Sequence, residues 1–128
     1  MSRLTSLKLV LTGFVFAAVL ATGLVQAKGP VGPEATMSVA ELPRQGTQTY
    51  SLIHQGGPFA HEKDGVVFGN RERLLPSKNR GYYREYTVMT PGLRHRGTRR
   101  IVCGGQPTTP DTCYYTADHY ASFRKIVP

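Results

Sequence analysis

Three kinds of side chain between residues 81 and 119 could together cleave a phosphodiester bond. Glu85 lies in an aromatic and β-branched run, and the arginine-rich sequence RHRGTRR follows it at residues 94–100. A histidine, His119, comes later in the sequence ADHYASF. A carboxylate can accept a proton, an imidazole can donate one, and guanidinium groups can stabilise a charged phosphorane. The combination favours acid–base cleavage of a phosphodiester without a metal ion.

Each of these residues also has an ordinary structural explanation. A glutamate in a strand usually faces solvent, and clustered arginines usually form a solvated basic surface or a non-specific phosphate patch. A single histidine is more often a packed or surface residue than a catalyst. The chemical interpretation gains weight because all three lie on segments that would be neighbours in one small sheet, where cross-strand side chains come into contact.

Side-chain alternation gives the chemical interpretation a structural requirement. In the strand expected at residues 82–88, odd-numbered side chains, including Glu85, should point to one face and even-numbered ones to the other. The chemistry requires Glu85 to share its face with Arg96 and Arg100. The sequence alone does not say which face is open to substrate.

The first 27 residues have the layout of a secretory signal peptide. Arg3 and Lys8 precede an apolar stretch at residues 9–25, and Val25-Gln26-Ala27 offers a plausible cleavage site. An uncleaved membrane anchor is the alternative, because the apolar stretch is long for a signal peptide. Cleavage after residue 27 would leave 101 residues with no later segment able to span a membrane. We therefore expect a secreted protein, extracellular or periplasmic, without membrane association after cleavage.

The charge and size of the chain limit its possible partners. The 128 residues carry 16 Lys and Arg against 8 Asp and Glu, and the mature part keeps a formal charge of +6. A basic secreted domain suggests an anionic partner, either nucleic acid or an acidic surface. A mature chain of this length suits one small domain that buries about two-thirds of its unfolded surface. The scattered histidines and the absence of CxxC spacing predict no metal site and no cofactor.

The two cysteines are expected to form a disulfide. Cys103 and Cys113 both lie in the exported part and flank the loop sequence GGQPTTPDT. In an oxidising compartment, an even pair around a short loop favours a disulfide over a metal or redox site.

The mature chain divides into a lead-in and one domain. Residues 28–38 contain Gly and Pro without periodicity and predict a flexible lead-in, so we place the domain at residues 39–128. Apolar positions within residues 43–55 allow one helix, which Gly56-Gly57-Pro58 would end. Strand-like patterns follow at residues 65–68, 82–88, 99–103, 113–116 and 122–127. The sequence therefore predicts an α+β fold, with one N-terminal helix packed on a small antiparallel β-sheet.

Three sequence motifs resemble those of a known family. They read DGVVFGNRE, GYYREYTVMTPGLRHRGTRRIV and YYTADHYASF, in that order and at characteristic separations. They resemble the small secreted bacterial guanyl-specific ribonucleases, the Sa-type branch of the barnase-like microbial ribonuclease superfamily. The resemblance extends from about Val39 to Ile126 and implies the microbial ribonuclease fold.

The resemblance implies a role for each catalytic candidate. Glu85 would be the general base that activates the ribose 2′-hydroxyl, and His119 would protonate the leaving 5′-oxygen. Arg96 and Arg100 would bind the phosphate. Asp118, also part of the family pattern, would either orient the imidazole of His119 or cap a turn.

Guanine specificity would lie in the sequence FGNRE. The Glu72 carboxylate could accept the two donors of guanine, N1–H and the exocyclic amine, while backbone N–H groups bind O6. An ordinary surface turn is the alternative explanation of this sequence. The substrate-binding residues implied by the resemblance are Phe68, Gly69, Asn70, Arg71, Glu72 and Tyr120.

The resemblance also implies partners and exposes two departures from the family pattern. We expect a monomer that acts on single-stranded RNA and can be bound by a barstar-like protein inhibitor. A non-catalytic basic RNA- or surface-binding protein of the same fold, or an antibacterial ribonuclease toxin, is the alternative. Gly69 stands where the relatives carry glutamine, and Cys103–Cys113 replaces a family disulfide that joins the two ends of the domain.

Overall fold

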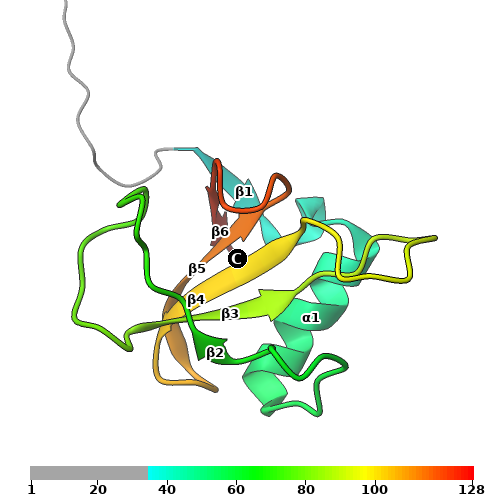
Figure 1. Cartoon of the computed structure of the whole chain (residues 1–128), viewed down its shortest axis with the longest axis horizontal. Helices are drawn as coiled ribbons and strands as arrows, with labels where there is room; N and C mark the ends of the chain where they lie inside the picture. The colour runs from blue at the N-terminus through cyan, green and yellow to red at the C-terminus, as the bar shows by residue number, and fades with distance from the viewer. Residues whose placement is uncertain (1–34) are drawn as a thin grey trace, which may run out of the picture.

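The computed structural model describes residues 35–128 and consists of one helix against a six-stranded sheet (Figure 1). The strands lie in the order β1-β6-β5-β4-β3-β2. In chain order the elements are β1 (Thr36–Ser38), a 3₁₀ turn (Val39–Glu41), α1 (Arg44–Gln55), β2 (Val66–Val67), β3 (Tyr83–Thr87), β4 (Arg100–Gly105), β5 (Pro110–Thr116) and β6 (Arg124–Val127). The α+β prediction is confirmed.

The sheet is mixed, which corrects the prediction of a purely antiparallel sheet. Strands β2 to β6 pair antiparallel, but β1 pairs parallel with β6, with Met37 opposite Ile126. The expected flexible lead-in is wrong for Thr36–Ser38, because these residues form β1. A three-residue strand has too few positions to show alternation, and the buried Met37 holds it to the core. The expected signal peptide at residues 1–27 lies outside the described residues.

Helix α1 buries one narrow face against the sheet. Its buried residues are Gly46, Thr49 and Ile53, spaced three and four apart as a helical stripe requires. Gly46 weakens the helical pattern in the sequence, yet a Cβ there would lie 3.3 Å from the Cβ of Leu42. Gly56 ends the helix with a φ of 85°, a left-handed conformation that favours glycine.

The two faces of the sheet carry different clusters. The face toward α1 holds the main core, in which Ile53 packs with Tyr86, Val88 and Ile101. The opposite face holds a smaller cluster of Leu75, Tyr83, Val102, Tyr114 and Phe123. Alternation along β3 therefore places Glu85 beside this second cluster, on the face that α1 leaves uncovered.

Cys103 and Cys113 form a disulfide between β4 and β5, as predicted. The two residues are direct cross-strand partners, and both are buried in the main core. The bond closes a loop with a sequence separation of 10 residues and limits the conformations of the unfolded chain.

We expect the double variant Cys103→Ala/Cys113→Ala to unfold more easily. Its free energy of unfolding should fall by about 2–3 kcal/mol from the loss of loop closure, with a further loss from the two vacated core positions. Urea unfolding monitored by tyrosine fluorescence measures the difference. An unchanged free energy would show that the disulfide adds nothing to stability.

Candidate active site

Glu85 lies at the centre of β3, in contact with two arginines. Its Oε1 accepts a hydrogen bond from Arg96 Nη2 at 2.7 Å and lies 3.7 Å from Arg100 Nε. The Glu85 side chain is 15% exposed, so the carboxylate remains reachable from solvent. The structure thus brings these three residues together on one face, as the chemical interpretation requires. Two guanidinium groups beside one carboxylate provide several N–H donors that can also bind an anionic ligand.

Arg100 is buried but incompletely paired. The residue is 3% exposed, and its Nη1 donates to the carbonyl oxygens of Gly97 and Arg99 at 3.0 and 2.8 Å. Within residues 35–128, its Nε has no hydrogen-bond acceptor. A buried guanidinium with an unsatisfied donor costs free energy. An anion that accepts this hydrogen bond would recover that cost.

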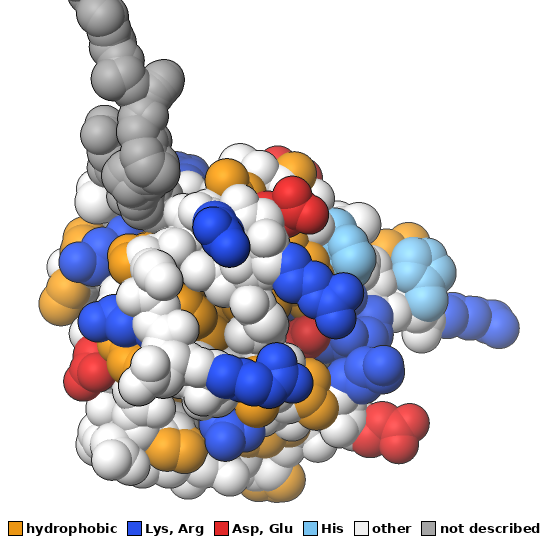
Figure 2. Space-filling model, turned by 60° about the vertical axis from the view of Figure 1, so that its left-hand side comes forward, with side chains coloured by type: hydrophobic (Ala, Val, Ile, Leu, Met, Phe, Trp, Pro, Cys, Tyr) orange, Lys and Arg blue, Asp and Glu red, His pale blue; other side chains and the backbone are white. Residues whose placement is uncertain are grey.

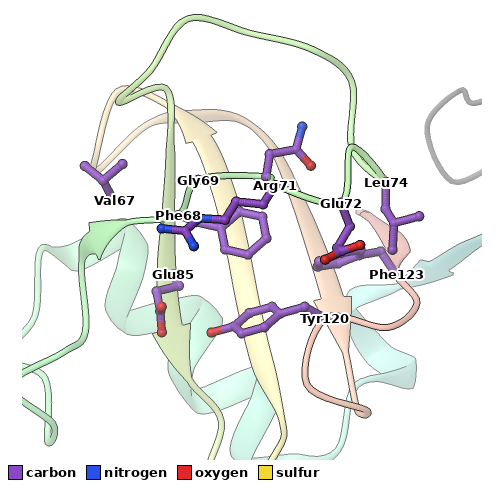
Figure 3. Close-up of a pocket in the computed structure, with 10 residues that line it drawn as sticks. Val67, Phe68, Gly69, Arg71, Glu72, Leu74, Glu85, Tyr120 and Phe123 are labelled. Atoms are coloured by element: carbon purple, nitrogen blue, oxygen red, sulfur yellow. The ribbon is translucent and has the colours of Figure 1, made fainter.

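A pocket of about 290 Å³ opens beside Glu85 (Figure 3). The loop from Phe68 to Leu74 forms one wall, and Tyr120 and Phe123 form another. All six of the expected substrate-binding residues line it: Phe68, Gly69, Asn70, Arg71, Glu72 and Tyr120. The volume suits one small aromatic group better than an extended ligand.

Asn70 fixes the shape of the pocket loop. Its φ is 53°, and its amide donates to the Leu75 carbonyl at 2.9 Å and accepts from the Leu75 N–H at 3.1 Å. Asparagine tolerates this left-handed conformation better than most residues. Asn70 therefore holds the two ends of the loop together, and its side-chain hydrogen bonds are directed to the protein.

The side chains around the pocket combine aromatic and charged groups. The Phe68 and Tyr120 rings lie 4.9 Å apart. In Figure 3, the Glu72 carboxylate lies beside Phe123, and the Arg71 side chain extends past Phe68 toward the Glu85 side. Basic side chains also gather on one face of the molecule (Figure 2). An aromatic ring could stack here, with a carboxylate at one edge and cations at the other.

Tyr120 connects the pocket to Glu85. Its hydroxyl and the Glu85 carboxylate face each other (Figure 3). Burial, followed by the negative charge of Glu85, raises the pKa of Tyr120 to about 12. The hydroxyl therefore stays protonated at neutral pH and has a proton that it can donate toward Glu85 or a ligand.

His119 lies in the turn between β5 and β6. Its backbone N–H donates to the Thr98 carbonyl at 3.0 Å, and its exposed ring lies 4.7 Å from the Tyr120 ring. His119 and Tyr120 both have positive φ, 56° and 76°. Such backbone conformations are uncommon outside glycine and often occur at functional sites.

Asp118 caps the turn that carries His119. Its carboxylate accepts from Thr116 Oγ1 at 2.8 Å, Ser122 N at 2.9 Å and Ser122 Oγ at 2.6 Å. The hydrogen bonds from Ser122 and then Thr116 lower the pKa of Asp118. Of the two roles considered from the sequence, these contacts favour capping.

Two residues that contact Arg96, Asp64 and Thr87, were not predicted as part of the site from the sequence. Asp64 marks a turn in the sequence, but its side chain is only 5% exposed and lies 3.9 Å from Arg96 Nη2. Thr87 Oγ1 accepts a hydrogen bond from Arg96 Nε at 2.8 Å. Odd-numbered alternation along β3 placed Thr87 on the face of Glu85, and this was the available signal for it.

Residues 35–128 include no group of three His, Cys, Asp or Glu side chains arranged to hold a metal ion. In the same range, no helix has the length and apolar character needed to cross a membrane.

Comparison with known proteins identifies the family. A family model described as ribonuclease matches residues 26–127. Guanyl-specific ribonuclease Sa of Kitasatospora aureofaciens is 54% identical over 91 residues, covering 71% of this chain and 92% of that protein. Guanyl-specific ribonuclease Sa3 of the same organism is 58% identical over 85 residues, 66% of this chain but only 58% of that longer protein.

Solved structures agree with the sequence comparison. Ribonuclease Sa2 in complexes with mononucleotides superposes with a TM-score of 0.70 at 46% identity, covering 78% of this chain and 98% of that chain. Ribonuclease Sa2 with guanosine-2′-cyclophosphate superposes with a TM-score of 0.67 at 48% identity, covering 73% of this chain and 96% of that chain. The family model, the two identities and the shared fold lead to one conclusion: the chain belongs to the ribonuclease family.

Proposed function

We propose that this protein is an endoribonuclease that cleaves RNA on the 3′ side of guanosine without a metal ion. The carrying observation is the Glu85 carboxylate, which contacts Arg96 and lies near Arg100 beside the pocket. One carboxylate between two cations can accept a proton next to a bound phosphate. Relatives named guanyl-specific ribonucleases, and a related structure with a guanosine cyclophosphate, support the assignment.

In the first step, the substrate ribose acts as its own nucleophile. Glu85 takes the proton of the 2′-hydroxyl, and the 2′-oxygen attacks the adjacent phosphorus. The bond from phosphorus to the 5′-oxygen breaks, and His119 gives that oxygen a proton. The product is a 2′,3′-cyclic phosphate and a free 5′-hydroxyl. DNA lacks the 2′-hydroxyl and is therefore not a substrate.

In the second step, water opens the cyclic ester. His119, now neutral, takes a proton from water, and Glu85 returns its proton to the departing 2′-oxygen. The products are a 3′-phosphate and two groups restored to their starting states. Arg96 and Arg100 stabilise the charge on the non-bridging oxygens in both steps.

Guanine recognition belongs to the pocket loop. Glu72 accepts from guanine N1–H and the exocyclic amine, while loop N–H groups from Phe68 onward donate to O6. Adenine has an unprotonated N1, which would face the carboxylate and leave polar groups unpaired. Gly69 does not conflict with this role, because the N–H groups belong to the backbone.

A non-catalytic RNA-binding protein of the same fold is a weaker hypothesis. Glu85 places a negative charge beside two phosphate-binding cations and so lowers the affinity for RNA, which a protein that only binds RNA has no reason to retain. An antibacterial toxin would use the same chemistry and differ only in delivery. We further propose that the protein is secreted, acts as a monomer on single-stranded RNA and can be bound by a barstar-like inhibitor; the disulfide supports an oxidising compartment.

Cleavage of dinucleotides in EDTA tests the proposal. We expect GpC to give cytidine and guanosine 2′,3′-cyclic phosphate, in EDTA as fast as without it, and ApC to react much more slowly. Chromatography of the products measures both rates. Activity that disappears in EDTA and returns with magnesium would contradict the mechanism, and binding of RNA without cleavage would support the non-catalytic alternative.

A further inference from the structure

The guanidinium of Arg96 is held through two of its three nitrogens. Its Nη2 donates to Glu85 Oε1 at 2.7 Å, and its Nε donates to Thr87 Oγ1 at 2.8 Å. A bound phosphate would compete with Glu85 for the first of these hydrogen bonds. The second is made to a neutral hydroxyl and would remain, so Thr87 can keep the orientation of Arg96 when its partner changes.

Thr87 is itself fixed in place by both of its backbone groups. Its N–H donates to Asp64 Oδ1 at 2.7 Å, and its carbonyl accepts from Thr49 Oγ1 on α1 at 3.0 Å. Thr87 is 4% exposed and lies opposite Arg100 in the pairing of β3 with β4. The hydroxyl that accepts from Arg96 therefore belongs to a buried residue whose backbone N–H and carbonyl are both hydrogen-bonded.

Asp64 reinforces the same arrangement. Its Oδ2 also accepts from the His61 N–H at 3.2 Å, so both carboxylate oxygens are engaged by backbone donors. Its Oδ1 lies 3.9 Å from Arg96 Nη2, within range of a favourable charge interaction. The side chain is 5% exposed, which limits screening by solvent.

We propose that Thr87, anchored by Asp64, is a positioning residue that aligns Arg96 on the substrate phosphate. This inference rests on the proposed function, because it assumes that Arg96 binds phosphate. Loss of the hydroxyl leaves the Nε donor of Arg96 without its acceptor and allows the guanidinium to rotate about its side chain. The phosphate, and not the guanine base, should then be bound less well.

Two substitutions at Thr87 separate positioning from simple stability. Thr87→Val keeps the size and branching of the side chain but removes the hydroxyl, whereas Thr87→Ser keeps the hydroxyl. Ile126→Val, in the core pair between β1 and β6, is a control that loses packing but no polar contact with the site. Calorimetry with guanosine and with guanosine 3′-monophosphate measures the affinity for the base and the additional contribution of the phosphate.

We expect Thr87→Val to weaken binding of guanosine 3′-monophosphate about 5–10-fold, as for the loss of one ordinary hydrogen bond, with guanosine affinity unchanged. The kcat for GpC should fall by a similar factor or more, because the transition state carries more charge on the phosphate. Thr87→Ser and Ile126→Val should bind guanosine 3′-monophosphate and cleave GpC nearly as well as the unsubstituted protein. Equal affinities for the phosphorylated ligand in Thr87→Val and the unsubstituted protein would overturn the inference.

A second variant keeps the test valid if Thr87→Val does not fold. Thr87→Ala also removes the hydroxyl that accepts from Arg96 Nε, and unlike Thr87→Val it places no methyl group against the guanidinium. It should show the same selective loss of phosphate affinity, and an equal loss for guanosine would count against positioning. If the unsubstituted protein failed to bind guanosine 3′-monophosphate or to cleave GpC, the proposed function itself would be wrong.

Discussion

Glu85→Gln is expected to lower the rate of GpC cleavage by about 10²–10⁴, the usual contribution of a positioned acid or base. The amide is close in size to the carboxylate and can still accept a hydrogen bond from Arg96, but it cannot take the proton of the 2′-hydroxyl. Because the substitution removes a negative charge beside Arg96 and Arg100, binding of guanosine 3′-monophosphate should be unchanged or tighter. Slow cleavage with retained binding is the signature of a lost base.

His119→Gln should cause a loss of similar size, because no proton would then reach the leaving oxygen. Steady-state rates with GpC measure both variants. Two matched controls lie away from the site: Glu62→Gln, an exposed glutamate before β2, and His54→Gln, an exposed histidine on α1. If Glu85→Gln and His119→Gln cleaved GpC as fast as these controls, both assigned roles would be wrong.

Most of the fold was accessible from the sequence, because its signals are local. The helix within residues 43–55 appears as α1, and all five expected strands are present, with shifts of a few residues at their ends. Gly56 ends the helix as expected. Strand β1 was missed because its parallel pairing with β6 joins two distant segments of the chain. Three residues carry no periodic signal of such a long-range contact.

The sequence predicted only part of the candidate site. Alternation along β3 placed Glu85 and Thr87 on one face, and the structure brings Arg96 and Arg100 to the same carboxylate. The position of Arg96 depends on a turn whose path the sequence does not specify. Asp64 gave no signal beyond its turn with Gly65, because burial and backbone hydrogen bonds are properties of the folded chain.

Asn70 shows how a residue can belong to a binding site without contacting the ligand through its side chain. The FGNRE resemblance suggested substrate binding, whereas the Asn70 amide bonds to the backbone of Leu75 and sets the shape of the loop. This anchoring also bears on Gly69. A Cβ at position 69 would meet only Arg71 side-chain atoms, at 3.6 and 3.8 Å, so glycine is not required there by close packing. The loop is held by Asn70 whatever residue occupies position 69.

The base preference should therefore depend on Glu72. In Glu72→Ala, guanine N1–H and the exocyclic amine lose their acceptor, whereas adenine loses an unfavourable neighbour. An unpaired hydrogen-bonding group costs about 1–3 kcal/mol, so kcat/KM for GpC should fall by about one to two powers of ten. The value for ApC should change little or rise slightly. The ratio of the two, measured in the same buffer, reports the change in preference.

The matched control is Glu62→Ala, which removes one negative charge from an exposed position outside the pocket lining. It shows how a higher positive charge alone affects the affinity for RNA. This general effect should raise kcat/KM for GpC and for ApC by the same factor. Any change in kcat/KM that Glu72→Ala shows beyond the change in Glu62→Ala is therefore due to the pocket. Equal losses on GpC and ApC in Glu72→Ala would show that Glu72 supports the loop and does not read the base, and the preference would then have to come from the backbone N–H groups that Asn70 holds in place.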